Sequence, residues 1–321
     1  MPDSNQDKVQ RELFVRSFFD VSPPAELAEM LAARMRDRRF EAGEIIYERD
    51  QPSGPVFFVT SGTVELGAPG EEPWVFHDKS LIGAIDANAG RPHPRTARAL
   101  TRVRAVEIHF DEYVMLLEDF FDFARDMVIQ GAHRTHETAL RLAPDGVLSP
   151  PPRPTGRWLG EGPLDEVQRL MALRSSFGFQ SAPVQALVNL ARSARELRLS
   201  AGEAAFGAGD DNRGVDIVID GRLEVTHDEP RMRSGVGPGQ FALGVLSMAP
   251  EPYAFSGRAE TDAVLLRIRH EDVFDAMEEH IGLLRAWWRY MGEENRRARE
   301  ELARRGLGTS DLASPRLAAP A

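Results

Sequence analysis

Three side chains that can carry or share positive charge lie close together at Arg91, His93 and Arg95. They follow a short segment around Gly83 that can begin a helix. A glycine-containing loop that leads into a helical turn presents backbone N–H groups to a phosphate, and arginine adds a matching cation. The stretch 81–99 (LIGAIDANAGRPHPRTARA) therefore predicts a site for a phosphate or a carboxylate. The alternative is a proline-stiffened turn whose charges face water.

A second stretch, 241–259 (FALGVLSMAPEPYAFSGRA), lies at the corresponding place in the second half of the chain. It differs from the first because no basic residue occurs between Gln240 and Arg258. Tyr253 and Phe255 are found instead, and we expect these rings to fill the site. The alternative is that they contact an apolar ligand or a partner.

The residue types of the chain give little support for catalysis by a metal ion or by a nucleophilic side chain. The chain has no cysteine, which excludes disulfides, thiolate catalysis and Cys-ligated zinc. Zinc sites need histidines and carboxylates that converge on one point, but the eight histidines are scattered. His133 and His136 are three residues apart in a helical segment, a spacing typical of a solvated face. We expect no catalytic residues, no metal ligands and no enzymatic activity.

Length and charge narrow the class of protein further. A chain of 321 residues with 42% hydrophobic residues is long enough for two domains. The net charge of −11 argues against a general surface for nucleic acid or anionic membrane. The N-terminus (MPDSNQDKVQRELF) has no apolar signal region, and no window of about 18 apolar residues predicts a membrane span. We therefore expect a soluble, cytoplasmic protein.

The order of local patterns predicts the domain organisation. Helical periodicity precedes and follows a run of short β-type segments separated by Gly and Pro, a texture typical of an antiparallel sandwich or barrel. A segment with four prolines at positions 150, 151, 152 and 154 separates two such blocks. We expect a flexible N-terminus (1–12), a first domain (13–142), a Pro-rich linker (143–163), a second domain (164–305) and a flexible tail (306–321).

An internal repeat is the strongest signal in the sequence. Ala42-Gly43-Glu44 recurs as Ala201-Gly202-Glu203, and Gly62-Thr63-Val64-Glu65 recurs as Gly221-Arg222-Leu223-Glu224, both 159 residues later. Arg98-Ala99 recurs as Arg258-Ala259, 160 residues later. A long ungapped match followed by one shift predicts two domains of the same fold. The repeated glycines predict turns with positive φ.

At these repeated residues the chain resembles the cyclic nucleotide-binding domain family. This is the β-roll module of catabolite-activator-type bacterial regulators and of the regulatory subunit of cAMP-dependent protein kinase. The resemblance rests on FEAGEIIYERDQPSGPVFFVTSGTVEL and LSAGEAAFGAGDDNRGVDIVIDGRLEV. It implies a mainly β fold with flanking α-helices. We expect two tandem β-rolls (double-stranded β-helices, jelly-roll-like), each with helices before and after the roll.

In the family, a phosphate-binding cassette reads approximately Phe-Gly-Glu-Leu-Ala and then Arg-x-Ala-Thr-Val-x-Ala. The Glu binds the ribose 2′-OH, and the Arg pairs with the cyclic phosphate. The resemblance places residues 81–99 (the first cassette) on this pattern, with Ala84 on the Glu, His93 on the Arg and Thr96 on the Thr. Arg91 and Arg95 lie two residues to either side of His93.

In residues 241–259 (the second cassette), no Glu is present, Tyr253 falls on the Arg and Ser256 on the Thr. The candidate ligand-binding residues of the first cassette are Gly83, Ala84, Ile85, Arg91, His93, Arg95 and Thr96. Their counterparts in the second cassette are Ala242, Leu243, Gly244, Tyr253 and Ser256.

The last helical segment, 281–302, predicts a partner surface. Its apolar residues follow a heptad spacing with one polar position, and they are Ile281, Leu284, Trp288, Met291, Asn295, Ala298 and Leu302. This pattern is typical of a coiled coil, so we expect a homodimer through this helix or a protein partner. Packing against its own roll is the alternative. Too few residues follow for a helix-turn-helix, so we expect no DNA as partner. The net charge and the lack of an apolar span predict no membrane partner.

We therefore predict a non-catalytic regulatory or scaffolding protein with degenerate cassettes. No cofactor is certain; cAMP or another small anionic nucleotide is expected at most in the first domain. One alternative is a cyclic nucleotide sensor (cAMP or cGMP) that binds through Arg95 or Arg91. Another, from a different class, is a cupin-like metalloenzyme.

Overall fold

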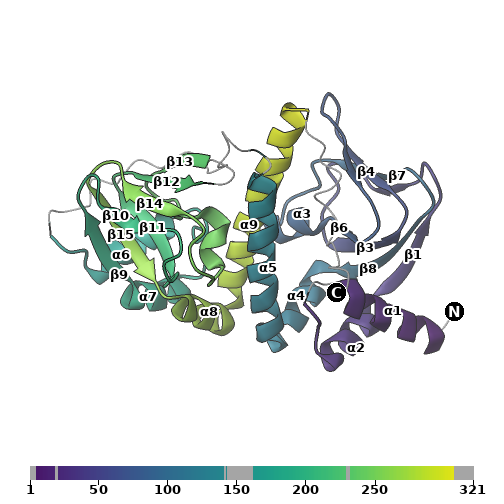
Figure 1. Ribbon diagram of the computed structural model, residues 1–321. Helices are drawn as coiled ribbons and strands as arrows, with labels where there is room; N and C mark the ends of the chain where they lie inside the picture. The colour runs from purple at the N-terminus through teal and green to yellow at the C-terminus, as the bar shows by residue number, and fades with distance from the viewer. Residues whose placement is uncertain (1–4, 19–20, 141, 143–161, 229–231, 307–321) are drawn as a thin grey trace. The chain divides into compact units, whose positions relative to one another are not determined.

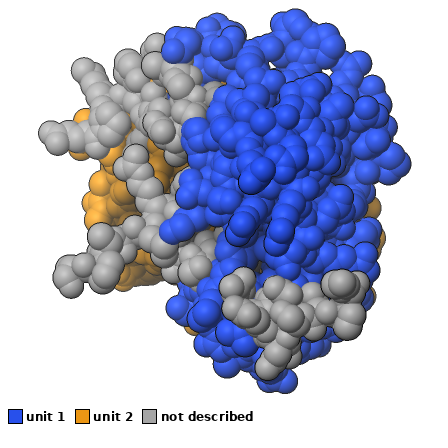
Figure 2. All heavy atoms as spheres, turned by 90° about the vertical axis from the view of Figure 1, so that its right-hand side faces the viewer, with its two compact units in different colours: residues 1–127, 302–321 blue, residues 128–301 orange. Residues whose placement is uncertain are grey.

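Two compact units make up the computed structural model, residues 1–127 with 302–321 and residues 128–301 (Figure 2). Each unit holds one antiparallel β-roll with helices around it (Figure 1), which confirms the predicted fold class. The structure describes residues 5–18, 21–140, 142, 162–228 and 232–306. Nearly all of the predicted Pro-rich linker and C-terminal tail lie outside these residues.

The first roll consists of two four-stranded antiparallel sheets, in the orders β1-β8-β3-β6 and β2-β7-β4-β5. Its strands are β1 (Arg36–Phe40), β2 (Ile45–Tyr47), β3 (Pro55–Ser61), β4 (Val64–Gly67), β5 (Trp74–Phe76), β6 (Ser80–Ile82), β7 (Thr96–Ala99) and β8 (Val103–His109). Its helices are α1 (Asn5–Phe18), α2 (Ala25–Arg34), α3 (Ala84–Ala89), α4 (Phe110–Asp119) and α5 (Phe121–Leu140). Apolar side chains of both sheets, among them Phe57, Leu66 and Ala97, meet in one core.

The second roll repeats this arrangement with sheets β11-β15-β9 and β10-β14-β12-β13. Its strands are β9 (Arg195–Leu199), β10 (Ala204–Phe206), β11 (Val215–Asp220), β12 (Leu223–His227), β13 (Met232–Val236), β14 (Ser256–Ala259) and β15 (Ala263–Ile268). Its helices are α6 (Glu166–Ser175), α7 (Val184–Ser193), the 3₁₀ helix η1 (Gly244–Met248), α8 (His270–Glu279) and α9 (Ile281–Arg304). The counterpart of β6 is reduced to a single bridge between Ile217 and Phe241.

Strand register fixes which residues of the two rolls correspond. Leu66 pairs with Trp74 on one side and Ala97 on the other, and Val225 pairs likewise with Ser234 and Gly257. Ser234 is therefore the counterpart of Trp74. Counting two residues back from Ala97 and Gly257 makes Phe255 the counterpart of Arg95.

The N-terminal helix begins at Asn5, so the expectation of a flexible segment over residues 1–12 was wrong from this point on. The reason is a buried arginine that ties the helix to the roll. Arg11 Nε donates to the Ala32 carbonyl at 3.0 Å, and Arg11 Nη1 lies 2.8 Å from Asp37 Oδ2. These contacts give residues 5–12 a fixed place.

The boundary between the compact units also differs from the expected one after residue 142. It falls inside α5, between Met127 and Val128, and again inside α9, between Glu301 and Leu302. The cause is packing within the second unit. A Cβ added at Gly131 of α5 would lie 2.7 Å from Met291 Cε of α9, and His133 Nε2 lies 3.1 Å from Glu251 Oε1. The C-terminal half of α5 therefore belongs with the second roll.

The predicted positive-φ turns are confirmed at all four repeated glycines, and two of them give a matched stability test. Gly202 (φ +86°) has nothing within 4 Å of an added Cβ, whereas the same atom on Gly221 (φ +72°) would lie 2.0 Å from the Asp262 carbonyl oxygen. We expect Gly202→Ala to lower the free energy of unfolding by roughly 1–2 kcal/mol, the left-handed cost alone. Gly221→Ala should lower the free energy of unfolding by about 1–3 kcal/mol more than Gly202→Ala, because its added Cβ would overlap the Asp262 carbonyl oxygen. Equal losses in urea titrations would contradict this account.

Candidate functional site

An aromatic stack occupies the first cassette at the position that the resemblance gives to the phosphate-binding arginine. His93 is only 2% exposed, and its ring stacks on Tyr47 at 3.8 Å between centroids with 17° between planes. Two backbone hydrogen bonds hold the loop against the turn after β2: Asp50 N–H to the His93 carbonyl at 2.8 Å, and His93 N–H to the Gln51 carbonyl at 3.0 Å. The residue that the resemblance places on the phosphate-binding arginine is thus a buried, stacked imidazole.

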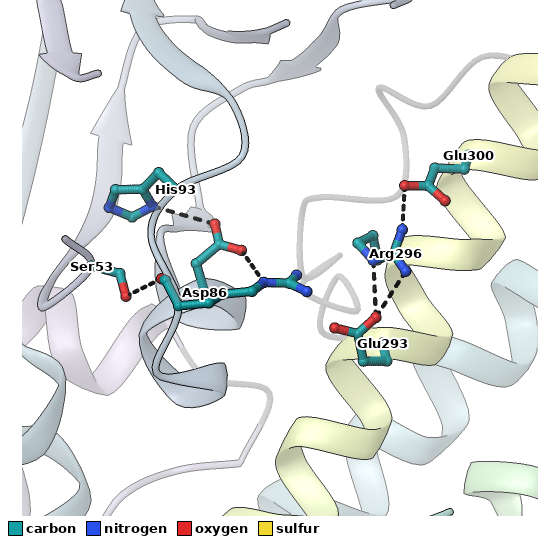
Figure 3. A network of polar contacts seen from close by, with 7 residues as sticks. Ser53, Asp86, His93, Glu293, Arg296 and Glu300 are labelled. Atoms are coloured by element: carbon teal, nitrogen blue, oxygen red, sulfur yellow. Dashed lines mark hydrogen bonds and ion pairs between the residues drawn. The ribbon is translucent and has the colours of Figure 1, made fainter. Parts of the chain in front are cut away.

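A carboxylate, which the sequence analysis did not single out, lies among the predicted basic residues. Asp86 on α3 points toward His93 (Figure 3), with 3.3 Å between Oδ2 and Nδ1, and its Oδ1 lies 3.2 Å from Arg91 Nε. Ser53 Oγ donates to the Arg91 carbonyl at 2.7 Å. Burial, with a smaller effect of Asp86, holds the pKa of the Tyr47 hydroxyl far above its ordinary value. Arg91 and His93 therefore lie close together, but both contact the Asp86 carboxylate.

Arg95 points elsewhere, into the interior of the first roll. It continues the inward face of β7, is 6% exposed, and its guanidinium lies 4.1 Å from the centre of the Trp74 ring. Its Nη1 donates to the carbonyls of Leu66 (3.3 Å) and Glu72 (3.0 Å), and its Nη2 pairs with Glu71. The predicted three-residue anion site is therefore divided, and each arginine has an acidic partner.

The other residues of the first cassette shape the loop. Gly83 is the N-cap of α3 at φ 86°, a left-handed conformation, and Ala84 and Ile85 form the first turn of this six-residue helix. The Thr96 hydroxyl oxygen accepts the Arg49 N–H at 3.0 Å and so caps the turn that follows β2.

The second cassette has the same stack made from different residues. Tyr253, 6% exposed, stacks on Phe206 at 4.4 Å and 19°. The same pair of backbone hydrogen bonds recurs, from Gly209 N–H to the Tyr253 carbonyl (2.8 Å) and from Tyr253 N–H to the Asp210 carbonyl (3.0 Å). Burial, followed by Asp216, raises the pKa of the Tyr253 hydroxyl to about 12. Ser256 Oγ accepts the Ala208 N–H at 3.1 Å, as Thr96 does in the first roll.

An arginine that sequence reasoning missed lies beside Tyr253. Arg267 on β15 and Tyr253 line one shallow depression, which also contains Asp210 and Asp211. Two hydrogen bonds of 2.7 Å join the Arg267 guanidinium to Asp216, which is 3% exposed. The positive charge of Arg267 is thereby matched by the buried Asp216 carboxylate. The strand register pairs Arg267 with Asp216, but the sequence carries no local signal for this pair.

An apolar pocket opens inside the second roll. Its floor comes from β12 and β13, at Val225, Met232, Ser234 and Val236. The cassette contributes Ala242, Leu243, Gly244 and the start of η1, together with Phe255. Thr135 and His136 of α5 and Glu294 and Ala298 of α9 complete the wall. Three residues of the predicted second site, Ala242, Leu243 and Gly244, therefore meet in the pocket, whereas Tyr253 and Ser256 lie outside it.

Two titratable groups of this pocket have strongly shifted pKa values. Burial raises the pKa of Glu294 to about 8, and its partner Arg297, 2.8 Å away, offsets only part of this effect. Burial, followed by His227 and His133, lowers the pKa of His136 to about 4. Both side chains are therefore mainly uncharged at neutral pH. His136 contacts the Phe255 ring at 5.1 Å, so the expected solvated face was wrong for this residue.

The buried stripe of α9 also differs from the predicted heptad seam. It runs through Leu283, Trp287, Tyr290, Glu294 and Ala298. Trp287 and Tyr290 pack on Phe241, with ring centroids 5.0 and 5.5 Å away. Of the predicted seam, Leu284 and Ala298 are buried and Met291 faces Gly131, so part of the seam packs within the chain. The homodimer through residues 281–302 stays a prediction.

Within the ranges that the structure describes, no three His, Asp or Glu side chains converge as metal ligands would. None of the helices in these ranges is both long enough and apolar enough to cross a bilayer.

The raised pKa of Glu294 predicts a pH-dependent stability. The folded protein retains a proton that the unfolded chain releases above its ordinary pKa near 4.5, so the unfolding free energy falls as pH rises from about 4.5 to 8. The slope is at most roughly 1.4 kcal/mol per pH unit. Glu294→Gln removes this contribution, so its stability relative to wild type should increase between pH 5 and pH 8 in urea titrations. Glu300→Gln, on an exposed face of α9, is the control. A constant difference for Glu294→Gln would contradict the shift.

Comparison with known proteins identifies the family of the chain. A model of the cyclic nucleotide-binding domain matches residues 37–120 and 196–280, which together are more than half of the chain. No curated protein matches. Among solved structures, the chain is similar to the regulatory domain of Toxoplasma gondii PKA with cAMP, at 14% identity over 88% of this chain and 95% of that one, with a TM-score of 0.34.

Two other structures are similar at comparable levels. A cAMP-bound PfPKA-R fragment is 14% identical over 98% of this chain and 96% of that one, with a TM-score of 0.36. A mutant of a cAMP-binding acyltransferase from Mycobacterium smegmatis is 19% identical over 41% and 43%, with a TM-score of 0.34. The two matched regions coincide with the two rolls, and the chain belongs to the cyclic nucleotide-binding domain family.

Proposed function

We propose that this protein is a non-catalytic regulatory module in which neither roll binds a cyclic phosphate in the manner of its family. The observation that carries the proposal is the stack at the arginine position of both cassettes, Tyr47–His93 and Phe206–Tyr253. A buried phosphate needs a cation or aligned N–H groups to replace its hydration. Here that position holds aromatic rings, and two neighbouring arginines, Arg91 and Arg267, are paired with Asp86 and Asp216.

The contacts that Arg95 would lose on binding a phosphate support the same conclusion for the first roll. Before it could bind a phosphate, Arg95 would give up its ion pair with Glu71, two carbonyl acceptors and the Trp74 ring. Hydrogen bonds to charged groups contribute roughly 1.5–3 kcal/mol each, and a cation–π contact about 0.5–2 kcal/mol. A ligand would have to replace all of these contacts.

The regulatory part of the proposal rests on the helices that follow each roll. In the second unit, α9 packs by Trp287 and Tyr290 on Phe241, the residue that begins the second cassette. A displacement of Phe241 would therefore change its contacts with α9. We propose that protein partners, rather than a reaction, read the position of this helix.

One observation favours the competing function, a cyclic nucleotide sensor in the first roll. The Glu71 side chain is 57% exposed, so its ion pair with Arg95 lies at the surface. An incoming phosphate would then exchange with Glu71 while the Arg95 stem stays in place.

Calorimetric titration with cAMP and with cGMP separates the two functions. We expect no saturable heat at millimolar nucleotide for wild type. Micromolar binding that is lost in Arg95→Ala but kept in Arg102→Ala would overturn the proposal in favour of the sensor. Arg102 is the matched control because its side chain is 74% exposed and paired with Glu41 at the surface.

A further inference from the structure

The pocket of the second roll exists because two large side chains of the first roll have smaller or apolar counterparts there. In the first roll, Trp74 and the Arg95 guanidinium stack at 4.1 Å and are both buried. In the second roll, Ser234 and Phe255 stand at the same register positions and line the pocket. Replacement of an indole ring by a hydroxymethyl group removes most of the volume that fills the first roll.

The walls of this pocket suit an uncharged ring. Phe255 offers an aromatic surface flanked by His136 at 5.1 Å and His227 at 4.8 Å between ring centroids. Val225, Val236 and Leu246 add aliphatic surface. No arginine or lysine is among the described lining residues, so an anion would be buried without a cation.

One polar group on α9 is placed to orient a ligand. Glu294 lines the pocket with a side chain that is only 8% exposed. Its Oε1 accepts from Arg297 Nη1 at 2.8 Å, and no hydrogen bond to Oε2 is found within the described ranges. The raised pKa of Glu294 supports a mostly protonated, uncharged carboxyl at neutral pH. Such a group can donate to one ligand atom or accept from another.

The size of the pocket limits the ligand. The cavity has a volume of ≈ 70 Å³. An apolar cavity of about 150 Å³ holds one benzene ring. The enclosed space therefore takes only part of a ring, and the rest of a ligand would extend through the opening of the pocket.

We propose that the second roll binds a neutral mono- or bicyclic aromatic molecule, with its ring against Phe255 and His136 and its polar group on Glu294. The proposal rests on the proposed function in one respect, namely that this roll works without a phosphate. Since Glu294 belongs to α9, the ligand would bridge the cassette to the helix that partners are proposed to read.

Titration with indole tests this inference, because indole is neutral and bicyclic and has one N–H donor. We expect saturable one-site binding by calorimetry and a rise in the melting temperature. Ser234→Trp, which restores the residue found in the first roll, should weaken binding at least tenfold. Thr226→Trp is the matched control, because Thr226 alternates with Val225 on β12 and faces away from the pocket. If Ser234→Trp fails to fold, Phe255→Leu keeps an apolar side chain and should weaken indole binding by removing the aromatic surface.

The outcomes separate this inference from the proposed function. Absence of saturable indole binding, or binding that Ser234→Trp and Phe255→Leu leave unchanged, overturns the inference, while a parallel negative titration with cAMP leaves the proposed function standing. Indole-3-carboxylate adds a charge to the same ring and should bind at least tenfold more weakly than indole. Equal affinity for the two would contradict a neutral site. Micromolar cAMP binding that Ser234→Trp abolishes would overturn the proposed function and the neutrality of the pocket together.

Discussion

The contact that the two cassettes share is a stack of two rings, one at the end of the second strand of each roll (β2 or β10) and one in the loop before β7 or β14. Tyr47 and His93 form it in the first roll, and Phe206 and Tyr253 in the second. Pairs of this kind contribute about 0.5–1.5 kcal/mol beyond the area they bury. Two backbone hydrogen bonds of nearly the same lengths accompany each stack, so the loop has the same path in both rolls although its residues differ.

The consequences of the stack differ between the rolls because the neighbouring residues differ. In the first roll, Arg95 packs over Trp74 inside the roll, and Asp86 and Glu71 pair with Arg91 and Arg95. In the second roll, Phe255 and Ser234 line an apolar pocket, and Arg267 is held by Asp216. One roll has thus become a filled core, while the other keeps a cavity without a cation.

The fold and the position of both cassettes were predictable because the repeat preserves them. The offsets of 159 and 160 residues place His93 and Tyr253 at the same point, and the structure finds the same stack there. The polar partners were not predictable from local spacing. Glu71, Asp216 and Glu294 reach their sites from a hairpin, an edge strand and the last helix, and only tertiary packing brings them to the cassettes. A weak signal for Glu294 did exist, since it interrupts the stripe formed by Leu283, Trp287, Tyr290 and Ala298.

The central claim is that aromatic stacks have replaced the phosphate-binding arginine, and the imidazole of His93 reports on it directly. In a protein labelled with ¹³C and ¹⁵N at histidine, the ring resonances of His93 should show the ring-current shift that stacking on Tyr47 causes. Addition of millimolar cAMP should leave these resonances unchanged. A saturable change in the His93 resonances on addition of cAMP would contradict the account, since it would place the nucleotide where the stack lies.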